Sequence, residues 1–557
     1  MDSTTAQKPA LNANATEQQS VIPTPDRLSI DDLEDARPAT NAQGGVQKIE
    51  AVTLTWSKNS VFLLLILIWF LTLVNNMKTS MVYSLTAYAT SDFLGHSLLT
   101  IISVVSSAMA GAVYIPMAKA LDLWGRAEGF MLMTLLCIIG IILLAASQNL
   151  PTYCAGEVFY SVGFGGLAYS WNVLAADITS LRNRGLAFAF TSSPALISAF
   201  AGSKAAAEFL LHSTWRWGYG MWAIVLPAFA FPVIALLTWN TRRAEKKVAG
   251  VLLFAGGMVV FLLPFTLAAS APNGWSTGYI IAMIVVGLFL LFAFALYEIK
   301  LAPVPFLNYQ VLSDRTVLGA CLLNTTYQIS YGCYASYLSS FLQVVYELDV
   351  ATAGYVGNTF SVVSFVFLFV AGWLIRWTGR FKWILWICVP LYIFGLGLMI
   401  HFRTPGGHIG YIVMCEIFFS ISGAIFILCT QLAVLASVDH QHIAAVLAFL
   451  FVMGSIGGSI GAAICGAIWT NTFLPALARN LPQSAMADLP VIYSSLVQQL
   501  SYPVGTPERD GIVAAYGYAQ PILLAAGTAF MALGFIWVGM MRNLNVKTMA
   551  QSKGNLF

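Results

Sequence analysis

The sequence predicts an all-α integral membrane protein with fourteen transmembrane helices arranged as six, two and six. Three observations predict this fold class. Of the 557 residues, 58% are hydrophobic and only 9% are charged, whereas soluble domains carry about 25% charged residues. Apolar runs long enough to cross a bilayer, which takes about 20 residues, recur along the chain. A short signature also occurs twice, which indicates two related halves.

The repeated signature is a Gly-Arg pair followed by an acidic residue inside an apolar run. Arg126 is followed by Glu157, and Arg380 is followed by Glu416. The two arginines are 254 residues apart and the two glutamates are 259 residues apart. Because order and spacing agree, we expect parallel halves related by an axis along the membrane normal.

The apolar runs define the helices in chain order. An even number of spans places both termini on the same side of the membrane. The signature falls on helices 2–4 and 10–12, so helices 7 and 8 are an insertion between the halves. We expect spans at 60–88, 97–118, 128–147, 152–176, 186–210, 217–238, 249–270, 278–297, 316–344, 353–375, 382–401, 409–435, 443–468 and 518–540.

Positive charge decides the orientation. The loops on the side of the termini carry most of the lysine and arginine residues, including the cluster at 242–247, whereas the opposite loops carry only Arg216, Arg403, Arg479 and Arg509. Positive loops stay in the cytosol, so both termini are expected there.

The segments outside the predicted spans divide the chain into two tails, two halves and an insertion. The first 55 residues are polar and almost free of aromatic residues, as in disordered segments. We therefore expect a disordered cytosolic tail at 1–55, a six-helix half at 56–240, the insertion at 241–300, a second half at 301–545 with a long external loop at 471–517, and a cytosolic tail at 546–557.

Two loops between helices carry similar glycine and charge patterns. One reads Leu121-Asp122-Leu-Trp-Gly125-Arg126 and the other runs from Gly372 to Lys382. Both resemble the loop signature of the major facilitator superfamily, Gly-x-Leu-x-Asp/Arg-x-x-Gly-Arg-x-Lys/Arg, although Ala118 replaces the first glycine. The alternative is a loop that only sets topology. The resemblance implies a cytosolic gate formed by Asp122, Gly125, Arg126, Arg184, Arg376, Gly379 and Arg380.

The two repeated glutamates lie inside the membrane, where an acid is costly and usually functional. Glu157 follows Pro151 by six residues, which is roughly 9 Å at 1.5 Å per residue. A carboxyl group away from water can exchange protons near neutral pH. We expect Glu157 and Glu416 to couple transport to protons or to bind cargo. The alternative is a structural acid paired with Arg, Lys or Tyr.

The superfamily resemblance makes helices 1, 4, 9 and 12 the cavity-lining set, and polar and aromatic residues crowd three of them. Hydrocarbon would penalise their unpaired amides, so we expect them to face a wet cavity suited to a large, uncharged, oxygen-rich ligand. The alternative for the tyrosines is interfacial packing. The expected cavity residues are Asn76, Tyr83, Tyr160, Tyr169, Asn172, Asn324, Tyr327, Gln328 and Tyr331.

Several classes of function are excluded. A phosphate-binding loop is absent, so ATP does not drive transport. The eight cysteines form no CxxC pair, which argues against a zinc site or a disulfide framework. The net charge of +3 is too small to indicate nucleic acid. We expect no metal site, no resident cofactor and no enzymatic activity, because no nucleophile–base set is present.

Longer stretches are similar to the fungal siderophore–iron transporters, a fourteen-helix branch of the superfamily. This resemblance implies a monomer in the plasma membrane, with endosomal vesicles as a second location, that imports ferric siderophores with protons. It implies hydroxamate cargo such as triacetylfusarinine C, with iron present only in the cargo, and capture of cargo by Tyr516 or Tyr518 of the last external loop. The stretches are 124–129, 177–185, 188–194, 215–218 and 439–445.

The main alternative is a fourteen-helix drug/proton antiporter, and a membrane receptor is a second one. Such antiporters usually carry Gly-Pro-x-x-Gly-Gly in helix 5, where this chain reads Thr191-Ser-Ser-Pro-Ala-Leu-Ile-Ser198. Import is therefore favoured. The chain departs from the family pattern in its short central loop at 242–247, and it departs from many superfamily members in carrying Glu157 where they have a basic residue.

Overall fold

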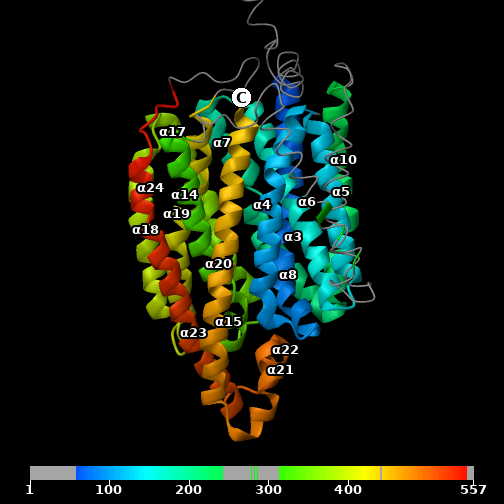
Figure 1. Cartoon of the computed structure of the whole chain (residues 1–557), viewed down its shortest axis with the longest axis vertical. Helices are drawn as coiled ribbons and strands as arrows, with labels where there is room; N and C mark the ends of the chain where they lie inside the picture. The colour runs from blue at the N-terminus through cyan, green and yellow to red at the C-terminus, as the bar shows by residue number, and fades with distance from the viewer. Residues whose placement is uncertain are drawn as a thin grey trace, which may run out of the picture.

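The computed structural model is a bundle of long helices that run roughly along one axis (Figure 1). The end of the bundle where the first described helix begins and the last one ends is called the terminal face. The opposite end, from which a small helical segment protrudes, is called the lid face. The structure describes residues 58–123, 125–241, 313–438 and 442–547, together with residues 278, 282, 285 and 286.

The N-terminal half consists of nine described elements. Two of its spans are interrupted: α7 and α8 meet at Pro194, which cannot donate a backbone hydrogen bond, and α9 and α10 meet at Met221. The elements are α3 (Lys58–Asp92), η1 (His96–Leu98), α4 (Leu99–Leu123), α5 (Arg126–Ala146), α6 (Leu150–Asp177), α7 (Leu181–Ser192), α8 (Ala195–His212), α9 (Trp215–Gly220) and α10 (Trp222–Thr241).

The C-terminal half repeats this arrangement with further interruptions. Helix α14 ends before Ser336, and α16 ends at Asn358, from which α17 continues. The elements are α14 (Arg315–Ala335), α15 (Leu338–Val345), α16 (Val350–Gly357), α17 (Thr359–Thr378), α18 (Lys382–Phe402), α19 (Ile409–Leu435), α20 (Ile443–Asn480), η4 (Gln483–Asp488), α21 (Leu489–Ser494), α22 (Leu496–Ser501), α23 (Pro507–Met531) and α24 (Gly534–Met540).

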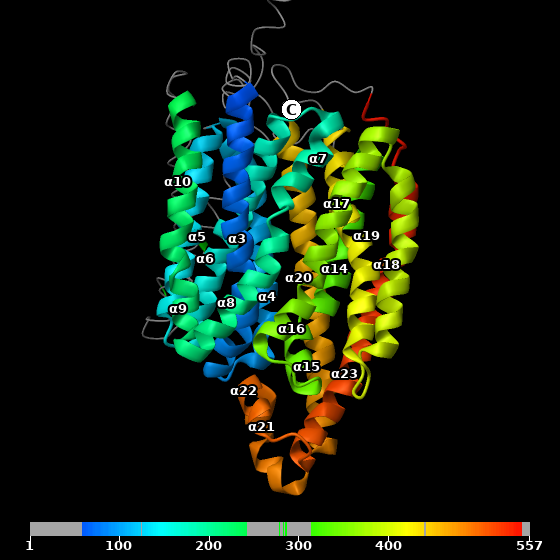
Figure 2. The ribbon, with the colours of Figure 1, turned by 180° about the vertical axis from the view of Figure 1, so that it is seen from behind.

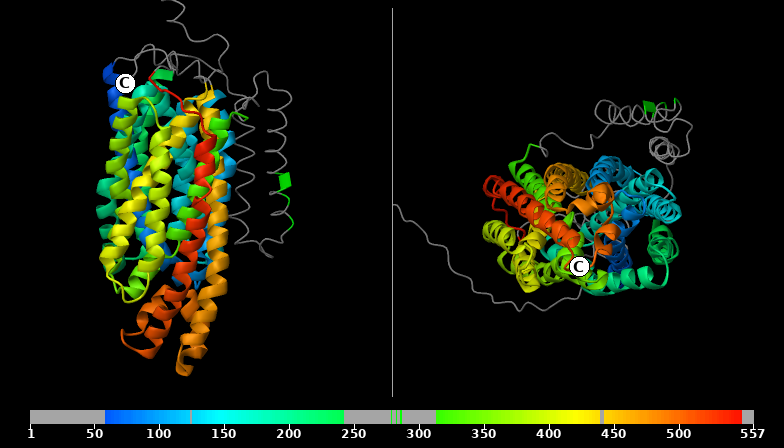
Figure 3. Two further views of the ribbon diagram at one scale, coloured as in Figure 1. Left: turned by 90° about the vertical axis from the view of Figure 1, so that its left-hand side faces the viewer. Right: turned by 90° about the horizontal axis from the view of Figure 1, so that it is seen from below.

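The two halves lie side by side and meet along several helix pairs, of which two have the most extensive contact. Helix α4 packs along α20, and α7 packs against α17. The second pair is visible from behind in Figure 2. Seen along the bundle axis, the helices of the two halves occupy opposite sides (Figure 3). This arrangement leaves the space between α3, α6, α14 and α19 for a cavity.

The membrane-spanning prediction holds for the described part of the chain. Ten described helices, some of them interrupted, are long and apolar enough to cross a bilayer. Helix α6 and the α14–α15 pair run beside them. Both carry many of the polar residues predicted for the cavity, which accounts for their lower hydropathy. The predicted helices at 249–270 and 278–297 lie outside the described residues apart from a few positions, so the count of fourteen stays a prediction.

The segment predicted as an external loop, 471–517, is helical at both of its ends. Helix α20 continues to Asn480, and α23 already begins at Pro507. The Thr506 hydroxyl accepts a hydrogen bond from the Arg509 N–H at 3.3 Å, and Pro507 occupies the first turn, so the helix begins with a favoured cap. Only the residues between these helices, 481–506, form a separate segment. We call it the lid.

Candidate functional site

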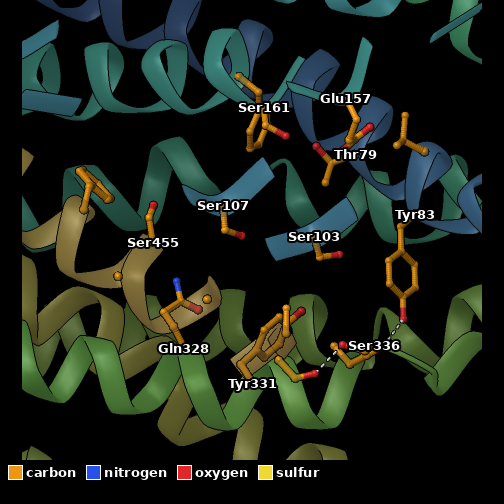
Figure 4. A pocket seen from close by; sticks show the side chains of 18 of the residues that line it. Thr79, Tyr83, Ser103, Ser107, Glu157, Ser161, Gln328, Tyr331, Ser336 and Ser455 are labelled. Atoms are coloured by element: carbon orange, nitrogen blue, oxygen red, sulfur yellow. Dashed lines mark hydrogen bonds between the residues drawn. The ribbon is translucent and has the colours of Figure 1, made fainter. Parts of the chain in front are cut away.

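A main cavity of about 650 Å³ lies between the halves. It is lined by α3, α4 and α6 on one side and by α14, α15, α19 and α20 on the other. Figure 4 shows Glu157 and Thr79 on one wall, with Gln328 and Tyr331 on the facing wall. Of the residues predicted for the cavity, those lining it are Tyr83, Tyr160, Asn324, Gln328 and Tyr331, and Glu157 lines it as well.

A second cavity of about 360 Å³ adjoins the main one. Its walls come from α3, α6, α7, α8, α17, α19 and α20, and they include the predicted residues Asn76 and Asn172. Ile427, Gln431 and Phe451 line both cavities. The two cavities therefore share one wall between them.

Two residues predicted for the cavity do not line either one. The Tyr169 hydroxyl donates a hydrogen bond of 2.6 Å to the carbonyl of Ala444 and so bridges the two halves. Tyr327 packs among the rings of Tyr331, Tyr392 and Phe426. The reason is helical geometry. Successive residues point about 100° apart, so a continuous polar run can present only one of its faces to the cavity.

Glu157 is the acid that faces the main cavity. It lies seven residues after Leu150 at the start of α6. Tyr160, Ser161 and Phe164 follow it along the same face of the helix, since all of them line the main cavity. The carboxyl group is therefore in reach of water and cargo inside the cavity.

Lys78 lies behind this wall, and the sequence analysis missed it. Its side chain is fully buried in α3. The ammonium group is 3.5 Å from Sγ of Cys137 and lies 4.8 Å from the ring centre of Tyr160 and 5.0 Å from that of Phe164. Its signal in the sequence is a lysine in the middle of the first apolar run.

Glu416 occupies the matching position in the C-terminal half but has different surroundings. It lies seven residues after Ile409 at the start of α19, and its side chain is fully buried. The Tyr334 hydroxyl donates a 2.6 Å hydrogen bond to its Oε1. Glu416 lines neither cavity. The duplication therefore placed two acids at the same depth in two different environments.

Arg403, which is predicted to lie in a loop on the side opposite the termini, is also buried. It follows α18, and its side chain has no exposed surface. Nη1 donates a 2.8 Å hydrogen bond to the backbone carbonyl of Tyr334. Tyr334 is thus held by Arg403 through its carbonyl and by Glu416 through its hydroxyl, next to the break between α14 and α15.

The predicted gate loops contain the expected glycine turns. Gly125 has φ of 128° and Gly379 has φ of 75°, a region that only glycine adopts without strain. Nε of Arg126 is 2.9 Å from Oδ2 of Asp177, and both side chains are buried. Asp177 closes α6 of the same half, so this pair ties α5 to α6 and does not by itself connect the halves.

The other predicted gate residues have different positions. Nη2 of Arg184 donates hydrogen bonds to the carbonyls of Ala176 at 2.7 Å and Thr179 at 3.0 Å. Arg376 and Arg380 are exposed at the terminal face. The side chain of Asp122 lies outside the described residues.

The halves touch at both faces of the bundle. Near the terminal face, a Cβ added to Gly372 of α17 would lie 3.1 Å from the carbonyl carbon of Gly185 of α7. Toward the lid face, Nδ2 of Asn358 donates hydrogen bonds to Ser80 at 3.0 Å and Ser203 at 2.9 Å. Contacts between the two halves therefore lie toward both ends of the bundle.

The lid also connects the halves. The backbone N–H of Leu496 donates a 2.9 Å hydrogen bond to the Ser91 hydroxyl of α3. The Tyr516 hydroxyl donates a 2.9 Å hydrogen bond to Oε1 of Gln499 in α22. Tyr516 is fully buried in α23, whereas Tyr518 is half exposed. Neither tyrosine lies in a loop, and only Tyr518 presents its ring at the surface.

The described residues offer no group of three or more His, Cys, Asp or Glu side chains able to hold a metal ion. The eight cysteines are free.

Comparison with known proteins places this architecture among transporters. The profile of the Major Facilitator Superfamily matches residues 68–462. An MFS siderochrome iron transporter B of Aspergillus fumigatus is 72% identical over 94% of this chain and 89% of its own length. A siderophore iron transporter of Emericella nidulans is 58% identical over 94% of this chain and 91% of its own.

Solved structures share the fold at low sequence identity. A crystal structure of a peptide transporter in complex with sulfate has a TM-score of 0.55 at 15% identity, covering 89% of this chain and 99% of its own. An inward-facing, unoccupied bacterial homologue of the human lysosomal transporter Spinster has a TM-score of 0.53 at 14% identity, covering 87% of this chain and 98% of its own.

Proposed function

Because the chain belongs to the siderochrome iron transporters of the major facilitator superfamily, we propose that it imports ferric siderophores by alternating access, driven by proton entry. It is a multi-pass membrane transporter and not an enzyme. We place it in the plasma membrane as a monomer, with both termini in the cytosol and with endosomal vesicles as a second location.

One observation carries this proposal. The main cavity is lined by hydroxyl, amide and aromatic side chains, and among the described residues Glu157 is its one ionisable carboxyl group. Hydroxyl and amide groups can donate hydrogen bonds to the carbonyl oxygens of a neutral chelate. Aromatic faces can cover its apolar parts. Such a lining suits an uncharged, oxygen-rich hydroxamate complex such as ferric triacetylfusarinine C better than a free ion.

The same geometry favours Glu157 as the acid that carries the proton. It borders the main cavity, whereas Glu416 is enclosed by Tyr334 and lies outside it. Proton entry at Glu157 and cargo binding would then occur in the same compartment. Glu416 would hold the helix break at Tyr334, and it would exchange protons only after that hydrogen bond opens.

The test is uptake of radiolabelled iron bound to triacetylfusarinine C in a fungus that lacks its own siderophore transporters. Uptake should be faster in acidic than in alkaline medium and should stop with an uncoupler. Glu157→Gln should lose uptake, while the matched variant Glu208→Gln, which affects an exposed ion pair with Lys204, should keep it.

Three outcomes would count against the proposal. Uptake that ignores the uncoupler would remove proton coupling. Lack of uptake with every hydroxamate tested, together with export of amphipathic drugs, would favour the drug/proton antiporter. Normal uptake by both Glu157→Gln and Glu416→Gln would exclude both acids from coupling.

A further inference from the structure

We infer that Lys78 is a positioning residue that links the protonation of Glu157 to the cargo-facing rings of Tyr160 and Phe164. This inference rests on the proposed proton-coupled uptake and names the group through which the proton would act on the cargo site. Lys78 is a buried lysine, and its contacts with uncharged groups do not explain why a lysine occupies this position.

Lys78 is an expensive residue in its position. A lysine inside the membrane must be paired or must serve a function. Its side chain is fully buried, and among the described residues it forms no ion pair within 4.0 Å. Its direct contacts are the Cys137 thiol and two aromatic rings. None of these groups supplies a negative charge at neutral pH, so packing alone does not account for the lysine.

Glu157 is the carboxyl group on this part of α6: it precedes Tyr160, whose ring centre is 4.8 Å from the ammonium group, by three residues, and it lines the main cavity together with Tyr160 and Phe164. Cations are also attracted to the faces of aromatic rings within about 6 Å. The ammonium group therefore has two attractors, the Glu157 carboxylate and the Tyr160–Phe164 pair. These two rings are stacked with centres 5.8 Å apart. Because both rings line the main cavity, any shift of Lys78 changes the wall that cargo touches.

The sequence of events follows from charge balance. Glu157 takes a proton from water in the main cavity when the lid face is open, and Lys78 keeps its own proton throughout. The neutral carboxyl group no longer holds the ammonium group, which then rests against the two rings. Glu157 later gives the same proton to water on the terminal face, and its negative charge draws Lys78 back.

Other ionisable groups near this pair are uncharged at neutral pH or are paired elsewhere. Helix α8 carries Lys204 and Glu208, which pair with each other on an exposed surface, and Asp92 at the end of α3 pairs with Arg216. The groups that face Lys78 or Glu157 from the neighbouring helices are Cys137 of α5, Tyr153, Cys154 and Tyr160 of α6, and Tyr219 of α9.

The experiment compares Lys78→Met, Lys78→Arg and the matched control Lys204→Met, with radiolabelled ferric triacetylfusarinine C as the probe. Two rates are measured: net uptake as a function of pH, and counterflow, the exchange of labelled for unlabelled cargo without net proton movement. Removal of a nearby positive charge strengthens proton binding by a carboxylate. Lys78→Met should therefore move the pH of half-maximal uptake upward by about one unit.

The expected pattern separates coupling from folding. Lys78→Met should lower net uptake about tenfold, the factor that one pH unit represents, while counterflow stays near wild type. Lys78→Arg keeps the charge and should restore the pH profile, and Lys204→Met should change neither rate. The double variant Lys78→Met/Glu157→Gln should be no worse than Glu157→Gln alone, because both changes act on one interaction.

Several results would overturn the inference. Equal loss of counterflow and net uptake in both Lys78 variants, with normal amounts at the cell surface, would mean that the lysine only supports the fold. Additive losses in the double variant would mean that Lys78 acts independently of Glu157. A wild type that ignores pH and uncoupler would remove the proposed function and this inference together. A responsive wild type with an unchanged Lys78→Met profile would remove this inference alone.

Discussion

The two repeated glutamates should respond differently to the same substitution. Glu416 accepts a 2.6 Å hydrogen bond from the buried hydroxyl of Tyr334. Arg403, which is also fully buried, donates a hydrogen bond to the backbone carbonyl of the same tyrosine. Glu157 has no such enclosed partner and faces the main cavity. Glu416→Gln should therefore act on stability, and Glu157→Gln should act on transport.

The size of the difference follows from these contacts. Glutamine can still accept the Tyr334 hydrogen bond, but the bond loses its charged acceptor, which is worth about 1.5–3 kcal/mol. We therefore expect about 1.5–3 kcal/mol for Glu416→Gln and less than about 1 kcal/mol for Glu157→Gln.

The assay is thermal melting of the purified transporter in detergent, read together with uptake by cells that carry equal amounts of protein. Glu416→Gln should melt several degrees below wild type, and Glu157→Gln should melt close to wild type but lose proton-driven uptake. Equal melting temperatures for the two variants would refute the different environments assigned to the two acids. A Glu416→Gln variant that is as stable as wild type and shows the same uptake as Glu157→Gln would also refute them.

Three further predictions concern the faces of the bundle. Gly372→Leu should push α17 away from the facing backbone of α7, so that a reagent added at the terminal face labels cysteines in the main cavity faster. The control Gly397→Leu should not change this labelling, because no atom lies within 4 Å of a Cβ added there. Equal labelling of the two variants would exclude the α7–α17 contact as a closure. Asp177→Asn should cost about 3–5 kcal/mol because it removes the carboxylate partner of the buried Arg126. The loss is measured as lower yield and melting temperature, and the exposed control Glu208→Gln should change neither. Hydrogen bonds from a neighbouring threonine and from backbone N–H groups hold the pKa of Asp349 below its ordinary value. The stabilisation of α16 by this N-cap should therefore be complete above about pH 4 and should be lost as the pH falls through the lowered pKa. Asp349→Asn should remove this acid dependence of the melting temperature, and an unchanged dependence would contradict the role of Asp349 as the cap.

The sequence predicted the overall architecture because the bilayer imposes strong local rules. Apolar runs must become helices that satisfy their own backbone hydrogen bonds. Gly125 and Gly379 were expected to form tight turns, and both adopt positive φ. Glu157 and Glu416 were expected at similar depths, and each lies seven residues into its helix. These features depend on composition and spacing, which are properties of the chain alone.

The sequence predicts less well where a helix ends within or beyond a long apolar run, and which face of a polar helix turns toward the cavity. The helical ends of the segment 471–517 were not predicted, because helices α20 and α23 continue beyond their apolar stretches. The polar run of α14 was assigned to the cavity as a whole, whereas Tyr327 packs into the protein interior. A sequence pattern gives the period of a helix, but the neighbouring helices fix which face turns inward.

The sequence by itself determined a membrane protein of two related halves, with a duplicated acid and a duplicated Gly-Arg turn. Only the tertiary structure decided what each acid does. Glu157 lines the cavity beside Tyr160, whose ring faces Lys78 of α3. Glu416 accepts a hydrogen bond from Tyr334 of α14, whose carbonyl accepts one from Arg403 at the end of α18. These partners lie far away along the chain, so spacing within one helix cannot reveal them. Identical positions in a repeat acquire different chemistry because packing supplies their neighbours.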